Sequence, residues 1–153
     1  MHSLLTFTSP AELSANVLEL GQIDPVTLCD LYHFRAIGKD TALYGITGWP
    51  LKVTSSPRMH NSGFRNDGMD AVYVPFCAEN ADEAFEFADT LGIRGFSVTV
   101  PHKEAIIPLL DEKDGKVEII GACNTVVHEK GVWRGYNTDC TGFSRALQDF
   151  TLL

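Results

Sequence analysis

Residues 95–104 read Gly-Phe-Ser-Val-Thr-Val-Pro-His-Lys-Glu, and this stretch constrains the fold more than any other in the sequence. Its apolar residues occupy every second position, with Ser97 and Thr99 between them, which is the period of a β-strand. Pro101 lacks the N–H group that a strand ladder needs, but it suits the first turn of a helix. The stretch therefore predicts a strand that is followed directly by a helix at Pro101.

Strand and helix patterns alternate from residue 41 onward. The predicted strands cover residues 4–7, 43–47, 71–76, 93–100, 124–129 and 132–136, with Lys130-Gly131 as the turn between the last two. The predicted helices cover a ten-residue segment after the Asp24-Pro25 cap, then 56–65, a segment from the Asn80 cap to Gly92, 101–110, 117–120 and 140–150. This order predicts the α/β class, with a mostly parallel but mixed sheet flanked by helices.

Composition excludes several classes of function. The chain has 153 residues and a formal net charge of −8, with no cluster of Lys and Arg, which argues against nucleic-acid and anionic-membrane partners. No apolar run approaches the roughly 20 residues that span a bilayer, and no secretory signal stands at Met1. The four cysteines form no C-x-x-C pair, and the five histidines show no metal-binding spacing, so we expect reduced thiols and no metal. We expect a cytoplasmic protein.

Polar side chains gather at the ends of three predicted elements. Open α/β sheets bind ligands outside the carboxyl ends of their strands, and helix amino termini favour carboxylates. The candidate residues are Thr54 and Ser56 beside one helix, Ser97, Thr99 and Lys103 around another, and Asn124 and Asp139 on either side of the hairpin. Such a set suits a small polyhydroxy acid, because a lysine near a carboxylate can exchange a proton with an alcohol.

Each candidate also has a simpler interpretation. Thr54 and Ser56 are residue types favoured in turns and caps, Asn124 in turns, and Asp139 at helix N-caps. Lys103 could be an ordinary surface lysine. The residues alone leave these alternatives open.

The sequence contains no G-x-G, and therefore no G-x-G-x-x-G fingerprint for a dinucleotide. We accordingly expect no cofactor-binding residues in this chain.

Five blocks of the sequence resemble, in the same order, the substrate-binding domain of the shikimate dehydrogenase family. They fall within residues 41–145 and read YGITGWP (44–50), TSSPRMHN (54–61), GFSVTVPHKE (95–104), GACNT (121–125) and GYNTD (135–139). The resemblance implies NADPH-dependent, reversible reduction of 3-dehydroshikimate to shikimate, on the route to chorismate and the aromatic amino acids. Lys103 and Asp139 would be the catalytic pair. Thr54 and Ser56 would hold the carboxylate, and Ser97, Thr99, Asn124, Lys103 and Asp139 the rest of the substrate.

Residues 1–38 resemble the C-terminal tail of a type I dehydroquinase with its linker, as in the plant-type bifunctional enzymes. The resemblance thus implies a remnant over 1–38, a substrate-binding domain over 39–153, and an NADP-binding Rossmann domain outside this chain but in the same polypeptide. A plant source would imply a plastid location. We expect the 153-residue chain alone to be inactive.

Two departures from the family pattern leave alternatives open. Serine is usual at the position of Thr54, and the added methyl group bears on the choice between shikimate and quinate. Serine at position 97 matches the plant type, where most bacterial relatives have asparagine. The alternatives are a quinate/shikimate dehydrogenase and a non-catalytic module that binds a shikimate-like acid.

Overall fold

A six-stranded mixed sheet forms the centre of the computed structural model, which describes residues 23–51 and 54–151. The strand order is β2-β1-β3-β5-β6-β4. The strands are β1 (Ala42–Gly48), β2 (Ala71–Cys77), β3 (Ile93–Val98), β4 (Glu112–Lys113), β5 (Thr125–Glu129) and β6 (Val132–Tyr136). β1 runs parallel to β2 and β3, β5 runs antiparallel to β3 and β6, and β4 runs parallel to β6. The predicted α/β class and its mixed sheet are confirmed.

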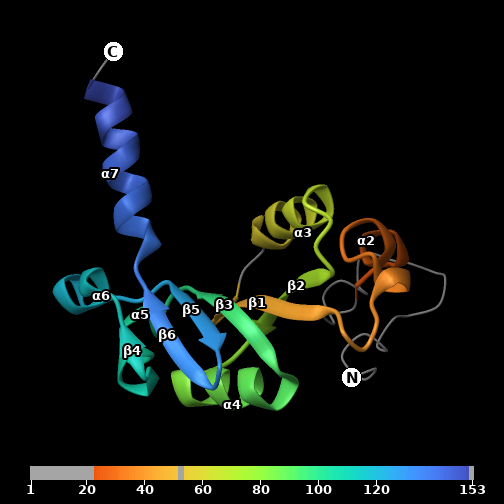
Figure 1. The fold of residues 1–153 in the computed structure, drawn as a ribbon, viewed down its shortest axis with the longest axis horizontal. Helices are drawn as coiled ribbons and strands as arrows, with labels where there is room; N and C mark the ends of the chain where they lie inside the picture. The colour runs from red at the N-terminus through yellow and green to blue at the C-terminus, as the bar shows by residue number, and fades with distance from the viewer. Residues whose placement is uncertain (1–22, 52–53, 152–153) are drawn as a thin grey trace.

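Helices lie on both sides of this sheet (Figure 1). They are α2 (Pro25–Asp30), α3 (Ser56–Asn66), α4 (Ala81–Leu91), α5 (His102–Ala105), α6 (Gly115–Ile120) and α7 (Thr138–Thr151), with short 3-10 turns η2 (Phe34–Ala36) and η3 (Ile107–Leu109). Figure 1 shows α4 on one side of the sheet, and α3 and α7 on the other. The end of α7 points away from the sheet, so only its first turns lie close to the strands.

The hydrophobic core lies between α4 and one face of the sheet. Phe96 and Val98 of β3 point into it and pack with Phe76 of β2, next to the fully buried Ala84 and Ala88 of α4. The predicted cap is confirmed, because the Asn80 side chain accepts a hydrogen bond from the Glu83 N–H. The apolar side chains of β3 therefore anchor the strand in the core, and its polar side chains face the side of α3.

Helix α3 is attached to the edge strand β2 by one buried side chain. Asn61 donates to the Tyr73 carbonyl at 2.9 Å and accepts from the Tyr73 N–H at 2.8 Å. An edge strand otherwise leaves such groups without a partner in its ladder. The Asn61 amide supplies both, and thereby fixes α3 against β2.

The first predicted helix is shorter than expected. Its Asp24 cap is confirmed, since the carboxylate accepts from the Thr27 N–H, but the helix ends at Asp30. The segment is poor in strong helix formers, and His33 adopts a left-handed φ of 49°, which ends any regular helix. The strand predicted for residues 4–7 lies outside the described residues.

The junction between β3 and α5 also differs in detail from the sequence prediction. β3 ends at Val98 and not at Val100, and Pro101 is the residue before the helix, since the His102 N–H closes a turn onto the Thr99 carbonyl. The helix predicted to Leu110 stops at Ala105. Pro108 has no N–H for the carbonyl four residues earlier and its ring would clash there, so η3 replaces the last turns.

Smaller differences occur at other boundaries. Ser55 precedes α3, so the cap predicted at Ser56 is one residue too late. The helix predicted around residues 117–120 begins at Gly115, after Asp114, whose carboxylate accepts from the Val117 N–H. The short strand β4 was not predicted. The hairpin turn is confirmed, because Lys130 and Gly131 both have positive φ values of 54° and 77°, as a two-residue turn of this type requires.

Replacing Asn61 by alanine should destabilise the fold by about 2–4 kcal/mol, because it leaves a buried donor and a buried acceptor of Tyr73 without partners. Urea unfolding followed by circular dichroism measures this loss. Ser62→Ala, at an exposed position of the same helix, is the matched control. Equal stability of the two variants would contradict a structural role for the Asn61 amide.

Candidate active site

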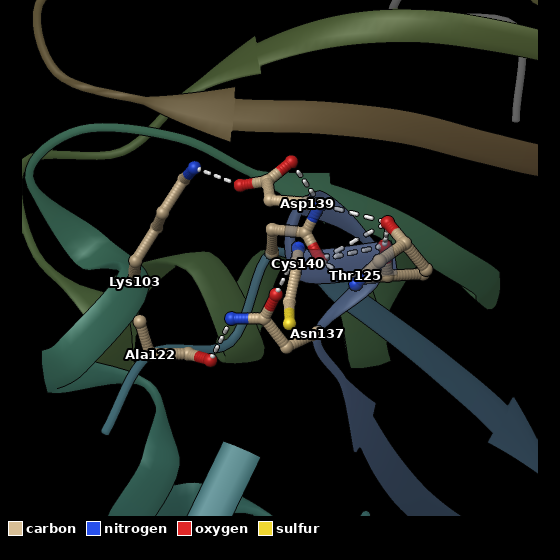
Figure 2. A network of polar contacts seen from close by, with 8 residues as sticks. Lys103, Ala122, Thr125, Asn137, Asp139 and Cys140 are labelled. Carbon is tan, nitrogen blue, oxygen red and sulfur yellow. Dashed lines mark hydrogen bonds and ion pairs between the residues drawn. The ribbon is translucent and has the colours of Figure 1, made fainter. Parts of the chain in front are cut away.

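Lys103 and Asp139, which lie 36 residues apart in the sequence, form an ion pair (Figure 2). The Lys103 Nζ lies 2.6 Å from the Asp139 Oδ2. Their side chains are 33% and 57% exposed, and pairs so open to solvent contribute about 0–1 kcal/mol to stability. The pair is therefore available for chemistry and is not a main support of the fold.

Asn124 holds the other oxygen of Asp139. Its Nδ2 donates to the Asp139 Oδ1 at 2.7 Å and to the Thr138 Oγ1 at 2.9 Å, while its Oδ1 accepts from the Thr138 N–H at 2.8 Å. Thr125 adds a weaker bond of 3.3 Å to the Asn124 Oδ1. The turn interpretation of Asn124 therefore understates its role, because the amide links the start of β5 to the first turn of α7.

Asn137 fixes where α7 begins. Its Oδ1 accepts from the Cys140 N–H at 3.0 Å, as an N-cap does, and its Nδ2 donates to the Ala122 carbonyl at 2.8 Å (Figure 2). Asp139 therefore lies in the first turn of a helix that starts at Thr138, two residues before the predicted start. The alternative that Asp139 is only an N-cap is wrong, because Asn137 fills that role.

A buried histidine sets the position of Lys103. His102 is 2% exposed, and its Nε2 donates to the Ala78 carbonyl at 2.7 Å. The Lys103 carbonyl in turn accepts from the Cys123 N–H at 2.8 Å, next to Asn124. Neighbours on both sides thus fix the backbone of Lys103, although its side chain reaches solvent.

Ser97 belongs to a second group of contacts. Its Oγ accepts from the Tyr73 Oη at 2.7 Å, and its cross-strand partner in β5 is Thr125. Thr99 lies one step further along the same face of the chain, and its N–H donates to the Thr47 carbonyl at 2.9 Å. Ser97 therefore lies between the edge strand β2, which it meets through Tyr73, and β5, which begins directly after Asn124.

Thr54 and Ser56 form a third group beside the start of α3. The Thr54 Oγ1 donates to the Ser56 Oγ at 3.0 Å and accepts from the Ser56 N–H at 3.2 Å. Thr54 thus makes the local turn bond that its simpler interpretation predicts. Both side chains remain partly exposed, so their hydroxyl groups remain accessible.

The structure thus brings some of the predicted residues together and not others. Lys103, Asn124 and Asp139 form one connected network. Within residues 23–51 and 54–151, no hydrogen bond or ion pair joins this network to Ser97, to Thr99, or to the Thr54–Ser56 pair. The sequence prediction missed Tyr73, Thr125, Asn137 and Thr138. The last three stand in the GACNT and GYNTD blocks, which are the signal that could have indicated them.

Other chemical features lie apart from this site. A cavity of about 280 Å³ lies between the segment around Phe34 and the sheet, and none of the candidate residues lines it. In the described part of the chain, no group of three or more His, Cys, Asp or Glu side chains could hold a metal ion. None of the described helices is long and apolar enough to cross a bilayer. All four cysteines are free thiols, and burial raises the pKa of Cys123.

Residues 46–126, more than half of the chain, match the family model described as the shikimate dehydrogenase substrate-binding domain. The chain belongs to this family. The domain is 41% identical over 138 residues to the chloroplastic bifunctional 3-dehydroquinate dehydratase/shikimate dehydrogenase of Arabidopsis thaliana. This match covers 89% of the chain and 23% of that protein. It is 47% identical over 113 residues to the shikimate dehydrogenase (NADP(+)) of Methanothermobacter thermautotrophicus, covering 72% of the chain and 40% of that protein.

A solved structure agrees with this assignment. The crystal structure of shikimate 5-dehydrogenase from Listeria monocytogenes in complex with shikimate and NAD superposes with a TM-score of 0.69 at 36% identity, over 75% of this chain and 40% of that one. The domain thus spans well under half the length of these three relatives.

His60 of α3 lies on the side of the sheet that carries Ser97, and it makes the stability of the domain depend on pH. Its ring stacks on Tyr73 with centroids 4.2 Å apart, and burial lowers the pKa of His60 from its ordinary 6.5. The unfolded chain therefore takes up the proton first as the pH falls. The contribution is fully present above about pH 6.5 and is lost as the pH falls through the lower folded pKa.

His60→Phe keeps an aromatic ring on Tyr73 and removes this titration, so its free energy of unfolding should fall less between pH 7.5 and pH 5 than that of the wild type. Urea unfolding at a series of pH values measures the difference. Arg58→Gln, at an exposed position of α3, is the control. Parallel pH profiles for the wild type and His60→Phe would contradict the shift.

Proposed function

We propose that this chain is the substrate-binding part of an NADP-dependent shikimate dehydrogenase, which reversibly reduces 3-dehydroshikimate to shikimate. The observation that carries the proposal is the network of Lys103, Asp139 and Asn124, which lie at positions where the sequence resemblance implies substrate contacts, in a chain of that family. Binding alone does not require a proton-transfer pair, so the network also favours an enzyme over a non-catalytic binding module.

Each candidate residue has a role in this proposal. Thr54 and Ser56 bind the carboxylate near the amino end of α3, where backbone N–H groups favour an anion. Ser97, Thr99 and Asn124 bind oxygens of the ring. Lys103 gives a proton to the carbonyl oxygen as the ketone becomes an alcohol, and Asp139 orients the ammonium group.

The relatives named shikimate dehydrogenase (NADP(+)) use NADP, whose reduced form NADPH would give a hydride to the carbonyl carbon and become NADP(+). The chain contains no G-x-G, and thus no glycine turn of the kind that holds a dinucleotide pyrophosphate. We therefore assign the cofactor to an NADP-binding domain elsewhere in the same polypeptide, and assign to this chain only binding, orientation and proton transfer.

The plant-type assignment is the finer part of the proposal. The match to the bifunctional Arabidopsis enzyme extends over 138 residues, against 113 for the Methanothermobacter enzyme, and the Arabidopsis protein is chloroplastic. The longer match supports residues 1–38 as a dehydroquinase remnant and linker, with the substrate-binding domain over 39–153. In a plant, this protein would work in the plastid, and otherwise in the cytoplasm.

Quinate/shikimate dehydrogenase is the second candidate, and Thr54 is the observation that bears on it. Quinate carries a hydroxyl group on the carbon that bears its carboxylate, so it needs more space at that end than shikimate. The Thr54 hydroxyl donates to the Ser56 hydroxyl, where we place the carboxylate, and the Thr54 methyl group is bonded to the same carbon as that hydroxyl. The extra methyl group therefore favours shikimate.

Lys103→Ala in the complete polypeptide should lower kcat for 3-dehydroshikimate about 100-fold or more, because it removes the proton donor. Steady-state oxidation of NADPH measures the effect. Lys113→Ala, an exposed lysine in β4, is the control and should keep wild-type turnover. Intact turnover in Lys103→Ala would remove the catalytic assignment.

Thr54→Ser should raise kcat/KM for quinate relative to shikimate by about tenfold, the lower end of what one methyl-sized group discriminates in a hydrophobic pocket, because this site is partly exposed. The two oxidation rates are compared with NADP in the complete polypeptide. Thr90→Ser makes the same change at an exposed position of α4 and should leave the ratio unchanged. An unchanged ratio in Thr54→Ser would show that Thr54 does not face the acid end of the substrate.

A further inference from the structure

A single hydrogen bond connects the edge of the sheet to one of the candidate substrate-binding residues. The Tyr73 hydroxyl of β2 donates to the Ser97 Oγ of β3 at 2.7 Å. β1 lies between these two strands, with Tyr44 opposite Tyr73 and Ile46 opposite Ser97. Neighbouring strands are about 4.8 Å apart, so only a side chain as long as tyrosine can reach across β1.

Tyr73 is held firmly in this position. Its side chain is 3% exposed and stacks on His60, with ring centroids 4.2 Å apart and an interplanar angle of 16°. Asn61 binds both backbone groups of the same residue. Burial raises the pKa of Tyr73, so the phenol keeps its proton at neutral pH and remains a donor. Ser97 thus receives a hydrogen bond from a fixed direction.

That bond determines what the Ser97 hydroxyl can do. A serine hydroxyl has one proton to donate and two lone pairs to accept with. Because Tyr73 occupies one lone pair, the proton of Ser97 is free to point elsewhere. The cross-strand partner on the other side of Ser97 is Thr125, whose hydroxyl bonds to the side chains of Asn124 and Thr138 and, among the described residues, not to the Ser97 hydroxyl. The proton is therefore available to a ligand bound beside the Asn124–Asp139–Lys103 network.

We propose that Tyr73 is a positioning residue for substrate binding, which fixes Ser97 as a hydrogen-bond donor to an acceptor oxygen of the bound acid. The inference rests on the proposed function, and it adds a residue that touches no substrate itself. It also specifies the ligand chemistry that Ser97 favours, which is an oxygen with a free lone pair, such as a hydroxyl, carbonyl or carboxylate oxygen. Without the phenol, the Ser97 hydroxyl would be free to rotate, and in a fraction of the molecules its proton would point away from the ligand.

The test uses the complete polypeptide and three variants, Tyr73→Phe, Ser97→Ala and the double variant. Tyr73→Phe removes one hydroxyl and keeps the ring on His60. It should raise KM for 3-dehydroshikimate about three- to tenfold, the value of one hydrogen bond, with kcat within about twofold of the wild type. If Tyr73 acts through Ser97, the double variant should have the KM of Ser97→Ala alone. A purely structural effect would instead add to that of Ser97→Ala.

Tyr44→Phe is the matched control, since Tyr44 pairs with Tyr73 in register and its hydroxyl has no hydrogen bond in the described part of the chain. It should keep the wild-type KM. An unchanged KM in Tyr73→Phe, or a fully additive double variant, would overturn the inference.

Calorimetric titration with shikimate separates this inference from the proposed function. If the wild type binds shikimate but does not reduce 3-dehydroshikimate, the proposed function fails. Weaker shikimate binding in Tyr73→Phe and Ser97→Ala, but not in Tyr44→Phe, would still support the positioning role. If the wild type does not bind shikimate, both proposals fail.

Discussion

The packing of β3 against α4 is the constraint on which the rest of the candidate site depends. Phe96 and Val98 are 3% and 2% exposed in the core, so β3 cannot slip by one residue without burying Ser97 and Thr99 in their place. Such a slip would expose two large apolar side chains and bury hydroxyl groups without partners. The hydrophobic face of the strand therefore determines where its polar face points. The core therefore fixes the positions of the polar side chains of β3, and the contacts within the site are not needed to hold that strand in register.

The change from parallel to antiparallel pairing at β3 brings distant segments together. β5 enters beside β3 in the reverse direction, so Asn124, just before β5, lies near the carboxyl end of β3 and the start of α5. The β5–β6 hairpin then returns the chain to the same end, where Asn137 starts α7. A wholly parallel sheet would need a long crossover for this return, whereas the hairpin needs only Lys130 and Gly131. This arrangement places Asp139 within 2.6 Å of Lys103.

Much of this arrangement could be predicted from the sequence, because the strands and α4 carry clear periodic patterns. The Asn80 cap and the Lys130-Gly131 turn depend on local chemistry, and both were predicted correctly. Contacts that depend on the tertiary fold were not predicted. Nothing near Tyr73 in the sequence indicates Ser97, which lies 24 residues away and two strands across. The bond of Asn137 to Ala122 was missed for a related reason, since it forms only once the hairpin is folded. Its cap of α7 is local, and was missed because Asp139 was the residue considered for that role. The overlong helix after Pro101 is different, because Pro108 could have indicated its end.

The contacts of Asp139 imply unequal roles for the two members of the proposed catalytic pair. Both carboxylate oxygens are occupied, Oδ2 by Lys103 and Oδ1 by Asn124. An ammonium group has three N–H donors, and Lys103 uses one of them on Asp139, so others remain for a substrate oxygen. In the proposed reaction, Lys103 is therefore the group that meets the substrate, and Asp139 acts by holding it. Because the pair is partly exposed, water competes for those remaining donors, and proton transfer to the substrate is favoured only when water is excluded. In the proposed complex, the bound acid is the part that would displace this water.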